Sequence, residues 1–161
     1  VRIYVEDDDV RAVKGGTGYT KCGGNYAASI RAGERAEQNG YAQVLWLDGV
    51  HRKYIEEVGS MNVMFKVGDT VLTPELTGSV LPGITRKHLL QLAREHDIPV
   101  VEKPFSMVEL MNADELLVTS SSALCIPVES VDGIPVGGKD PQRLKLLQNA
   151  YLEKFQRETA R

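Results

Sequence analysis

The chain has 161 residues, of which 42% are hydrophobic and 25% are charged, and its formal net charge at pH 7 is −3. This length and composition are typical of one soluble globular domain, and we expect a single domain over residues 1–161. The small negative charge argues against nucleic-acid and membrane partners, and no apolar stretch approaches the ~20 residues of a membrane span. We therefore expect a cytoplasmic protein without a signal peptide.

The N-terminal quarter is predicted to form two short strands, a glycine-rich loop and a helix. The strands cover residues 3–5 and 12–13 and flank the acidic run at residues 6–9, which is interpreted as a solvated loop, with metal binding as the alternative. The loop covers residues 15–24, and the helix that follows ends at Gly40. Close packing of this helix on a sheet is predicted by a face of largely small residues, Tyr26, Ile30, Gly33 and Ala36.

Strands are predicted in the middle of the chain. Residues 43–47 and 54–59 are expected to pair through a turn, and residues 62–67 and 70–72 are expected to form a hairpin that Pro74 closes off. The two-residue turns between these strands require antiparallel pairing, so a purely parallel, doubly wound sheet is not expected.

Helices alternate with strands in the second half. One helix is expected to start at Thr85, as its N-cap, and to end before Pro99. Its core face is predicted to hold Leu89, Leu92, Ala93 and His96. Ser106 and Glu109 have the spacing of a capping box, and Asp140 is predicted to cap the last helix. The inner face of that helix is expected to hold Leu144, Leu147, Tyr151 and Phe155.

The remaining strands are predicted at residues 100–101, 116–118 and 126–128, followed by a hairpin turn at residues 132–133. Together these elements predict a mixed α/β fold with largely antiparallel sheets and packed helices.

Lys21 is the first candidate for chemistry, because it lies between two glycine-rich arms just before a predicted helix. A lysine becomes a nucleophile when a crowded, partly dry pocket favours its neutral form. The alternative is a surface lysine in a flexible loop. A phosphate-binding P-loop is excluded, since Lys21 follows Thr20 and precedes Cys22 instead of forming Gly-Lys-Ser/Thr.

Three further features are candidates. Glu57 ends a predicted strand, although alone it could be a surface carboxylate. The segment 81–87 is a glycine-bearing turn that leads into a helix, where free amides favour an anion, and a bound anion would offset Arg86 and Lys87 in the first turn. These two side chains could instead lie extended on the surface. The serines at 120–122 could hold another edge of an anion or form an ordinary polar turn.

Cysteines and histidines are not expected to bind metal. Cys22 and Cys125 are far apart, and a reduced state is expected for both; Cys22 could be a low-pKa thiol or a small buried neighbour. The histidines at 51, 88 and 96 have no metal-ligand spacing, so no metal site is predicted.

Four motifs together carry a family resemblance. They are KCGGNY at residues 21–26, EVGSMN at residues 57–62, LPGITR at residues 81–86, and the Ser121 turn before IPV at residues 126–128. Their order and spacing resemble those of branched-chain amino-acid aminotransferases, which are pyridoxal 5′-phosphate enzymes of fold type IV. The resemblance runs over nearly the whole chain.

The resemblance implies roles on the cofactor's ring side. Lys21 matches the lysine that forms a Schiff base with pyridoxal phosphate and then moves the proton of the substrate α-carbon. Tyr26 matches the tyrosine near the cofactor's phenolate oxygen. Glu57 matches the carboxylate that pairs with the pyridine nitrogen and keeps it protonated.

It also implies roles at the phosphate and substrate ends. Ile84 and Thr85 match the helix start that binds the phosphate. Ser121 matches a phosphate-contacting position that is usually threonine, and the amides of Ser121 and Ser122 match a turn that receives the substrate carboxylate. The implied partners are branched-chain amino acids and 2-oxo acids, and the full-length enzyme is implied to be a homodimer.

Two departures from the family follow from the same comparison. Only Cys125 stands near the turn where mammalian members have a paired Cys-x-x-Cys, so redox control by such a pair is not expected. The family's small N-terminal domain, which supplies a phosphate-binding arginine and much of the side-chain pocket, cannot be placed in the sequence. We therefore expect the large C-terminal domain, with residues 1–20 as a strand and the interdomain glycine-rich segment.

The chain by itself is expected to have weak or no transaminase activity. Other functions are compatible with the same motifs. D-amino-acid aminotransferase and aminodeoxychorismate lyase share the lysine, the glutamate and the helix start. A catalytically silent module that binds ligand or dimerises is the alternative from another class.

Overall fold

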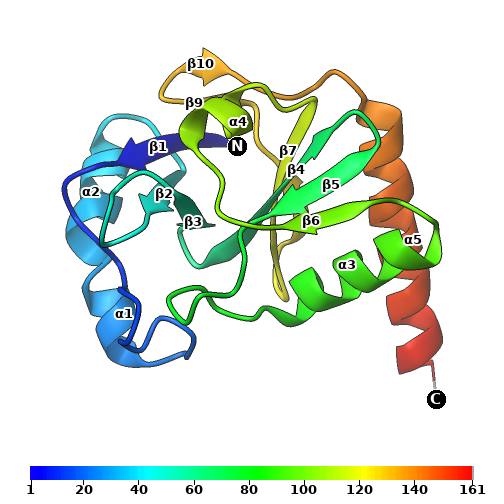
Figure 1. Cartoon of the computed structure of the whole chain (residues 1–161), viewed down its shortest axis with the longest axis horizontal. Coiled ribbons are helices and arrows are strands. Elements are labelled where there is room, and N and C mark those ends of the chain that lie inside the picture. The colour runs from blue at the N-terminus through cyan, green and yellow to red at the C-terminus, as the bar shows by residue number, and fades with distance from the viewer. Residues whose placement is uncertain (161) are drawn as a thin grey trace.

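The computed structural model describes residues 1–160, without the side chain of Arg143. Its helices are α1 (Gly23–Ala27), α2 (Ile30–Gln38), α3 (Ile84–Glu95), α4 (Met107–Met111) and α5 (Pro141–Thr159). Its strands are β1 (Arg2–Glu6), β2 (Gln43–Leu47), β3 (Ile55–Val58), β4 (Met61–Val67), β5 (Thr70–Thr73), β6 (Val100–Glu102), β7 (Glu115–Ser120), β8 (Leu124–Pro127), β9 (Ser130–Val131) and β10 (Ile134–Pro135). Figure 1 shows α1 and α2 at one end of the molecule and α3 and α5 at the other.

The described strands form one ten-stranded sheet. They are hydrogen-bonded in the order β10-β9-β1-β2-β3-β4-β5-β6, and β7 pairs with β4 and β8. Pairing is parallel between β1 and β2, between β1 and β9, and between β5 and β6. The other pairs are antiparallel, which confirms the predicted mixed, largely antiparallel α/β fold.

A row of neighbours crosses the middle of this sheet. Glu57 of β3 is paired with Trp46 of β2 on one side and with Asn62 of β4 on the other. Asn62 is in turn paired with Thr119 of β7. Because directly paired residues point to the same face, the side chains of this row lie on one face of the sheet.

Helices cover both faces of the sheet. Met64 of β4, which shares a face with Asn62, packs in a cluster with residues of α3 and α5, whereas Val63 packs in a cluster with Leu110 of α4. At the other end of the row, Trp46 packs against α2 through Ala32. Glu57 therefore lies between the parts of the face that α2 and α3 cover.

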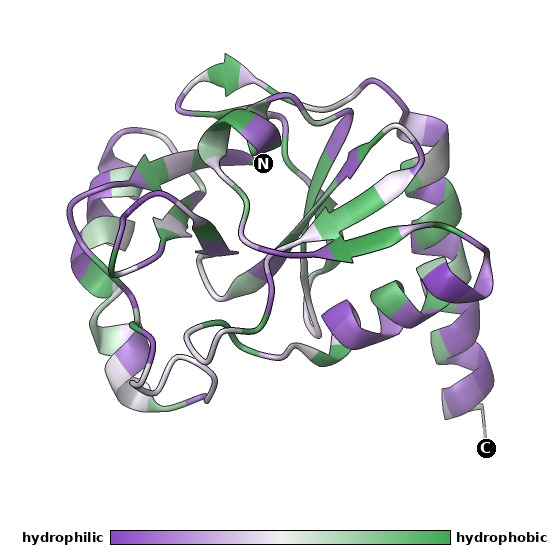
Figure 2. Ribbon diagram, in the orientation of Figure 1, coloured by the Kyte–Doolittle hydropathy of each residue, from purple (hydrophilic) through white to green (hydrophobic). Residues whose placement is uncertain are grey.

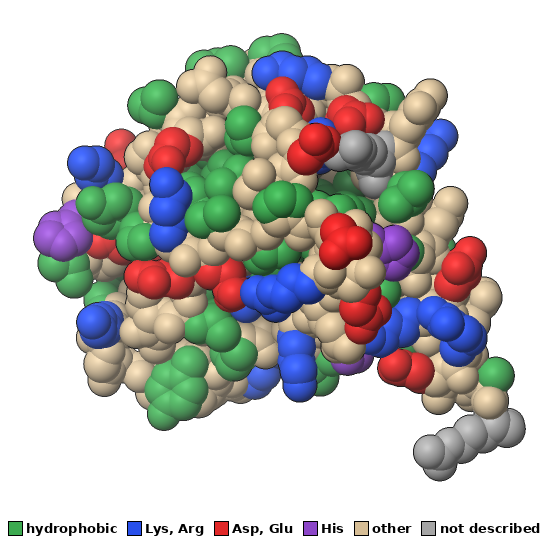
Figure 3. Space-filling view, turned by 45° about the vertical axis from the view of Figure 1, so that its right-hand side comes forward, with side chains coloured by type: hydrophobic (Ala, Val, Ile, Leu, Met, Phe, Trp, Pro, Cys, Tyr) green, Lys and Arg blue, Asp and Glu red, His purple; other side chains and the backbone are tan. Residues whose placement is uncertain are grey.

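The elements of the fold differ in hydropathy. In Figure 2, β5 and β6 are mainly hydrophobic, while the C-terminal part of α5 is mainly hydrophilic. Figure 3 shows acidic and basic side chains interspersed over one face, with hydrophobic patches between them. None of the described helices is long and apolar enough to cross a membrane.

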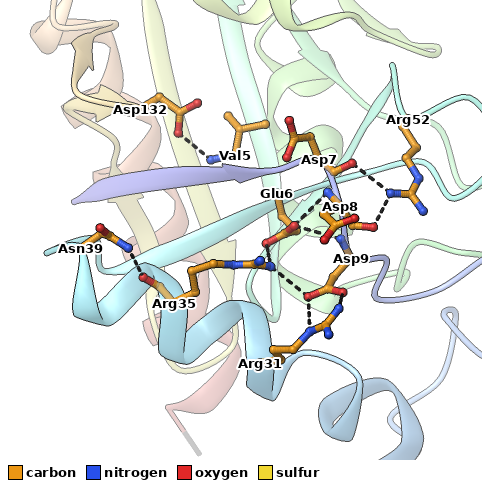
Figure 4. Close-up of polar contacts among 10 residues, drawn as sticks. All are labelled: Val5, Glu6, Asp7, Asp8, Asp9, Arg31, Arg35, Asn39, Arg52 and Asp132. Atoms are coloured by element: carbon orange, nitrogen blue, oxygen red, sulfur yellow. Dashed lines mark hydrogen bonds and ion pairs between the residues drawn. The ribbon is translucent and has the colours of Figure 1, made fainter.

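The acidic run differs from its prediction as a simple solvated loop. Glu6 is 1% exposed, and its Oε1 accepts the backbone N–H groups of Asp8 and Asp9, both at 2.9 Å. Arg35 of α2 donates to Glu6 Oε2 at 2.7 Å and to Asp9 Oδ2 at 2.9 Å (Figure 4). Arg52 also donates to backbone carbonyls of this run. The run is thus tied to α2, and only Asp7 and Asp8 are exposed.

One strand prediction and one helix prediction need correction near the N-terminus. Residues 12–13 are not a strand, and the helix after Lys21 is divided into α1 and α2 at Ala28 and Ser29. This division changes the phase of the helix, so Ile30 is 59% exposed instead of buried. Gly33 has no neighbouring atom within 4 Å of an added Cβ, so it does not pack on the sheet.

Later helix ends also differ in detail. The N-cap of α3 is Gly83, and Thr85 lies inside the first turn. His96 is the C-cap of α3 instead of a core position, and Phe155 of α5 is 52% exposed. The capping box of Ser106 at α4 is present as predicted.

Candidate active site

The loop that carries Lys21 has a defined conformation. Asn25, 4% exposed, donates to the carbonyl oxygens of Thr17 at 2.8 Å and Thr20 at 3.0 Å, and Thr17 Oγ1 donates back to Asn25 Oδ1 at 2.9 Å. A Cβ added to Gly18 would lie 2.1 Å from the carbonyl oxygen of Ser79, so only glycine fits there. Lys21 itself is exposed. The loop is therefore fixed while its lysine is accessible.

Tyr26 lies beside this lysine. The Lys21 Nζ atom is 6.0 Å from the centre of the Tyr26 ring. Tyr26 and Arg11 both line a cavity of about 600 Å³ that extends along α2 to Trp46. Lys21, Glu57 and the start of α3 do not line this cavity.

Glu57 is a buried carboxylate with partners on both oxygens. Its side chain is 2% exposed, Oε1 accepts the Leu81 N–H at 2.9 Å, and Oε2 forms an ion pair with Arg11. Burial raises the pKa of Glu57 to about 7, against the opposing effects of Arg11, the Leu81 amide and the charge of Lys21. The positive charge of Lys21 thus favours the ionised form of Glu57.

Arg11 was not predicted from the sequence. Its side chain is 10% exposed and donates to the carbonyl oxygens of Gly18 at 3.3 Å and Ser79 at 3.1 Å, in addition to its ion pair with Glu57. One guanidinium therefore joins the lysine loop, β3 and the segment before α3. A single arginine outside any motif gave no signal that could have identified it.

The start of α3 is open to an anion. Its N-cap, Gly83, offers no side chain to the first amides, so the N–H groups of Ile84 and Thr85 have no partner within the helix. Ile84 is 64% exposed, whereas Thr85 is buried and its hydroxyl lies 3.4 Å from that of Tyr151.

The side chain of Arg86 is not directed toward the first amides of α3. It is 4% exposed and donates to the Pro74 carbonyl at 3.0 Å and to Glu102 at 2.7 Å. The side chain of Arg86 therefore neither lies on the surface nor faces the site of a bound anion at the start of α3, because it is buried and already paired. Lys87 is exposed.

The serine turn follows the same row of the sheet. Ser120 Oγ accepts the Ala123 N–H at 3.0 Å and lies 3.2 Å from Ser122 Oγ, as in an ordinary polar turn. Ser121 and Ser122 are exposed. Just before the turn, Thr119 is 1% exposed and its hydroxyl has no partner among the described residues. The turn thus follows the residue paired with Asn62, but no hydrogen bond or ion pair among the described residues joins Ser121 to Glu57 or to α3.

The two thiols differ. The pKa of Cys22 is lowered to about 7, mainly by its hydrogen bond with the Thr17 hydroxyl, whereas burial raises the pKa of Cys125 to about 11. Both are free.

The sequence and fold were compared with those of known proteins. The family model for class IV amino-transferases matches residues 3–131. A Staphylococcus epidermidis protein named "Probable branched-chain-amino-acid aminotransferase" is 57% identical over 112 residues, which are 70% of this chain and 31% of that protein. Branched-chain-amino-acid transaminase 1 of Bacillus subtilis is 48% identical over 134 residues, 80% of this chain and 38% of that protein.

Solved structures give the same result. The branched-chain amino acid aminotransferase of Escherichia coli superposes with a TM-score of 0.85 at 34% identity, over 94% of this chain and 51% of that one. The PLP form of the Thermobaculum terrenum branched-chain aminotransferase has a TM-score of 0.85 at 26% identity, over 94% of this chain and 49% of that one.

This chain spans 31% of the S. epidermidis relative and 38% of the B. subtilis one. The matched segment contains the lysine loop, Glu57, the start of α3 and the serine turn. The chain belongs to the class IV aminotransferase family.

Proposed function

We propose that this chain is the large, cofactor-bearing domain of a branched-chain amino-acid aminotransferase and that Lys21 binds pyridoxal 5′-phosphate. The names of the relatives support the branched-chain group over D-amino-acid aminotransferases and aminodeoxychorismate lyases. The observation that carries the proposal is the buried carboxylate of Glu57, which is paired with Arg11 and accepts the Leu81 N–H just before α3.

The described residues fit such a cofactor. Glu57 offers a buried anion to a protonated ring nitrogen, and the uncapped amides of Ile84 and Thr85 offer donors to a phosphate. The unpartnered hydroxyl of Thr119 lies in the same row of the sheet as Glu57. Tyr26, beside Lys21, would lie near the phenolate oxygen, and Ser121 would contact the phosphate.

The bound cofactor supplies an aldehyde carbon for amines and a ring that withdraws electrons. Neutral Lys21 Nζ would hold the cofactor at that carbon, and it would take and return the α-proton of the substrate. Glu57 in its ionised form keeps the proton on the ring nitrogen. The amides of Ser121 and Ser122 orient the substrate carboxylate.

The full-length enzyme would transfer the amino group of leucine, isoleucine or valine to 2-oxoglutarate, as a cytoplasmic homodimer. Selectivity and turnover would depend on parts of the relatives that this chain does not match. We therefore expect the chain alone to bind the cofactor but to transaminate weakly or not at all.

Absorption spectroscopy tests the proposal. Pyridoxal phosphate added to the chain should give the shifted visible band of a lysine-bound cofactor, and sodium cyanoborohydride should remove it. Lys21→Ala should lack the band while keeping its fold by circular dichroism. Lys14→Ala, which removes the other lysine of the same region, should retain it; a band that survives Lys21→Ala would contradict the proposal.

A further inference from the structure

Asn62 lies where the two ends of the proposed cofactor site meet. It is 5% exposed at the start of β4, directly opposite Glu57 in the sheet. Its Nδ2 donates to the Leu81 carbonyl oxygen at 2.9 Å and to Glu57 Oε1 at 3.4 Å. One amide group therefore contacts both the carboxylate of β3 and the turn that precedes α3.

The turn before α3 is built onto this amide. Leu81 donates its N–H to Glu57 at 2.9 Å and accepts the N–H of Gly83 at 2.9 Å. A Cβ added to Gly83 would lie 2.1 Å from Asn62 Oδ1, so a larger residue at this position would displace the Asn62 side chain. The position of Gly83, the N-cap of α3, is thus set by contact with Asn62.

The two oxygens of Glu57 have separate surroundings. Oε1 faces Asn62 and Leu81, which are neutral donors, and Oε2 faces Arg11. The charged groups that act on Glu57 are Arg11, Lys21 and Glu56. The one that is bonded to the carboxylate, Arg11, contacts Oε2, so the hydrogen bonds at Oε1 come from neutral groups. Asn62 therefore orients the carboxylate without adding charge.

We propose that Asn62 is a positioning residue that couples the carboxylate of Glu57 to the first amides of α3. This inference rests on the proposed function. A ligand with a ring nitrogen at one end and a phosphate at the other needs the Glu57 carboxylate and the first amides of α3 at a fixed separation. Nothing in the chemistry of Asn62 requires it to touch the ligand.

A first experiment needs no cofactor. In the free protein, the backbone amide signals of Ile84 and Thr85 in NMR spectra should shift with pH at the midpoint of the Glu57 carboxyl, and Glu57→Gln should abolish this shift. In Asn62→Ala, Glu57 should still titrate, but the shift at Ile84 and Thr85 should fall by more than about half as coupling is lost.

Two further variants keep the test decisive. Gly83→Ala leaves the Asn62 amide intact but displaces it by contact, and it should reduce the same shift even if Asn62→Ala does not fold. Asn112→Ala removes an exposed asparagine that also donates to a backbone carbonyl, and it should change nothing. An undiminished shift at Ile84 and Thr85 in either Asn62→Ala or Gly83→Ala would overturn the inference.

A second experiment uses ligands of different length. The ratio of the dissociation constants of pyridoxal and pyridoxal phosphate measures what the phosphate adds, and Asn62→Ala should reduce this ratio by about fivefold or more, the size of a typical coupling between sites. An unchanged ratio would contradict the coupling. Failure of the wild-type chain to bind pyridoxal phosphate would instead contradict the proposed function, while the amide titration would still decide the role of Asn62.

Discussion

At the scale of single residues, the burial of Glu57 is the main electrostatic feature of the site. Burial raises its pKa to about 7 although Arg11 and the Leu81 amide favour the ionised form. The carboxyl group is therefore close to half protonated at neutral pH in the free protein. A cationic ring nitrogen placed beside it would favour ionisation, as the proposed role requires.

Stability should fall with rising pH because of this group. A carboxyl with a raised pKa in the folded state stabilises the fold below its usual pKa of 4.5, and this contribution is lost as the pH rises to about 7. Glu57→Gln lacks the titration and should become more stable relative to wild type by up to about 3 kcal/mol between about pH 5 and about pH 8. Urea unfolding of both proteins measures this; parallel pH profiles would contradict it.

The cysteines provide an independent test of local environment. Cys22 has a pKa lowered to about 7 by the Thr17 hydroxyl and neighbouring amides, and Cys125 has a pKa raised to about 11 by burial. Iodoacetamide at neutral pH should therefore alkylate Cys22 long before Cys125. Thr17→Val should slow the reaction of Cys22, as peptide mass mapping would detect. Equal rates at the two cysteines would refute this assignment.

At the scale of elements, local signals predicted strands better than helix faces. The hairpins and the Ser106 capping box depend on short turn and cap motifs, and the structure confirms them. The predicted face of α2 was correct at Ala36 but wrong at Ile30 and Gly33, because its periodicity was counted from Tyr26, across the break at Ala28 and Ser29. Parallel pairing of β1 with β9 joins distant segments, for which the sequence has no local signal.

Replacing Gly33 or Gly18 by alanine should change the free energy of unfolding in opposite directions. Gly33 lies inside α2 with open space around it, so Gly33→Ala should stabilise the protein by about 1 kcal/mol through helix propensity. Gly18→Ala should destabilise it, because the new Cβ would meet the Ser79 carbonyl oxygen at 2.1 Å. Urea unfolding compares the pair, and a loss of stability in Gly33→Ala would show that α2 is packed more tightly than described.

At the scale of the whole molecule, the site depends on contacts between distant segments. Sequence motifs named Lys21, Glu57 and the start of α3, because these positions share spacing with a known family. They could not show that Arg11 and Asn62 join those segments, since the contacts exist only when β3, β4 and the lysine loop meet. Arg86 illustrates the converse, a motif residue that the fold pairs with the carboxylate of Glu102 instead of leaving it free for a bound phosphate.

The region around the site also exposes apolar side chains. Tyr19 is 54% exposed, Leu76 is 46% exposed and Ile84 is 64% exposed. Scattered apolar exposure is common in folded proteins. Here, Tyr19 lies two residues before Lys21 and Ile84 is itself a proposed phosphate-binding residue, in a chain that spans less than two fifths of the curated relatives named above.

The most direct test of the central claim is reduction with borohydride in the presence of pyridoxal phosphate, followed by peptide mapping. We predict that the reduced cofactor is found on Lys21 in the wild-type chain, and that Lys14 is not labelled at equimolar cofactor. Labelling at other lysines with none on Lys21 would contradict the claim that this loop carries the cofactor.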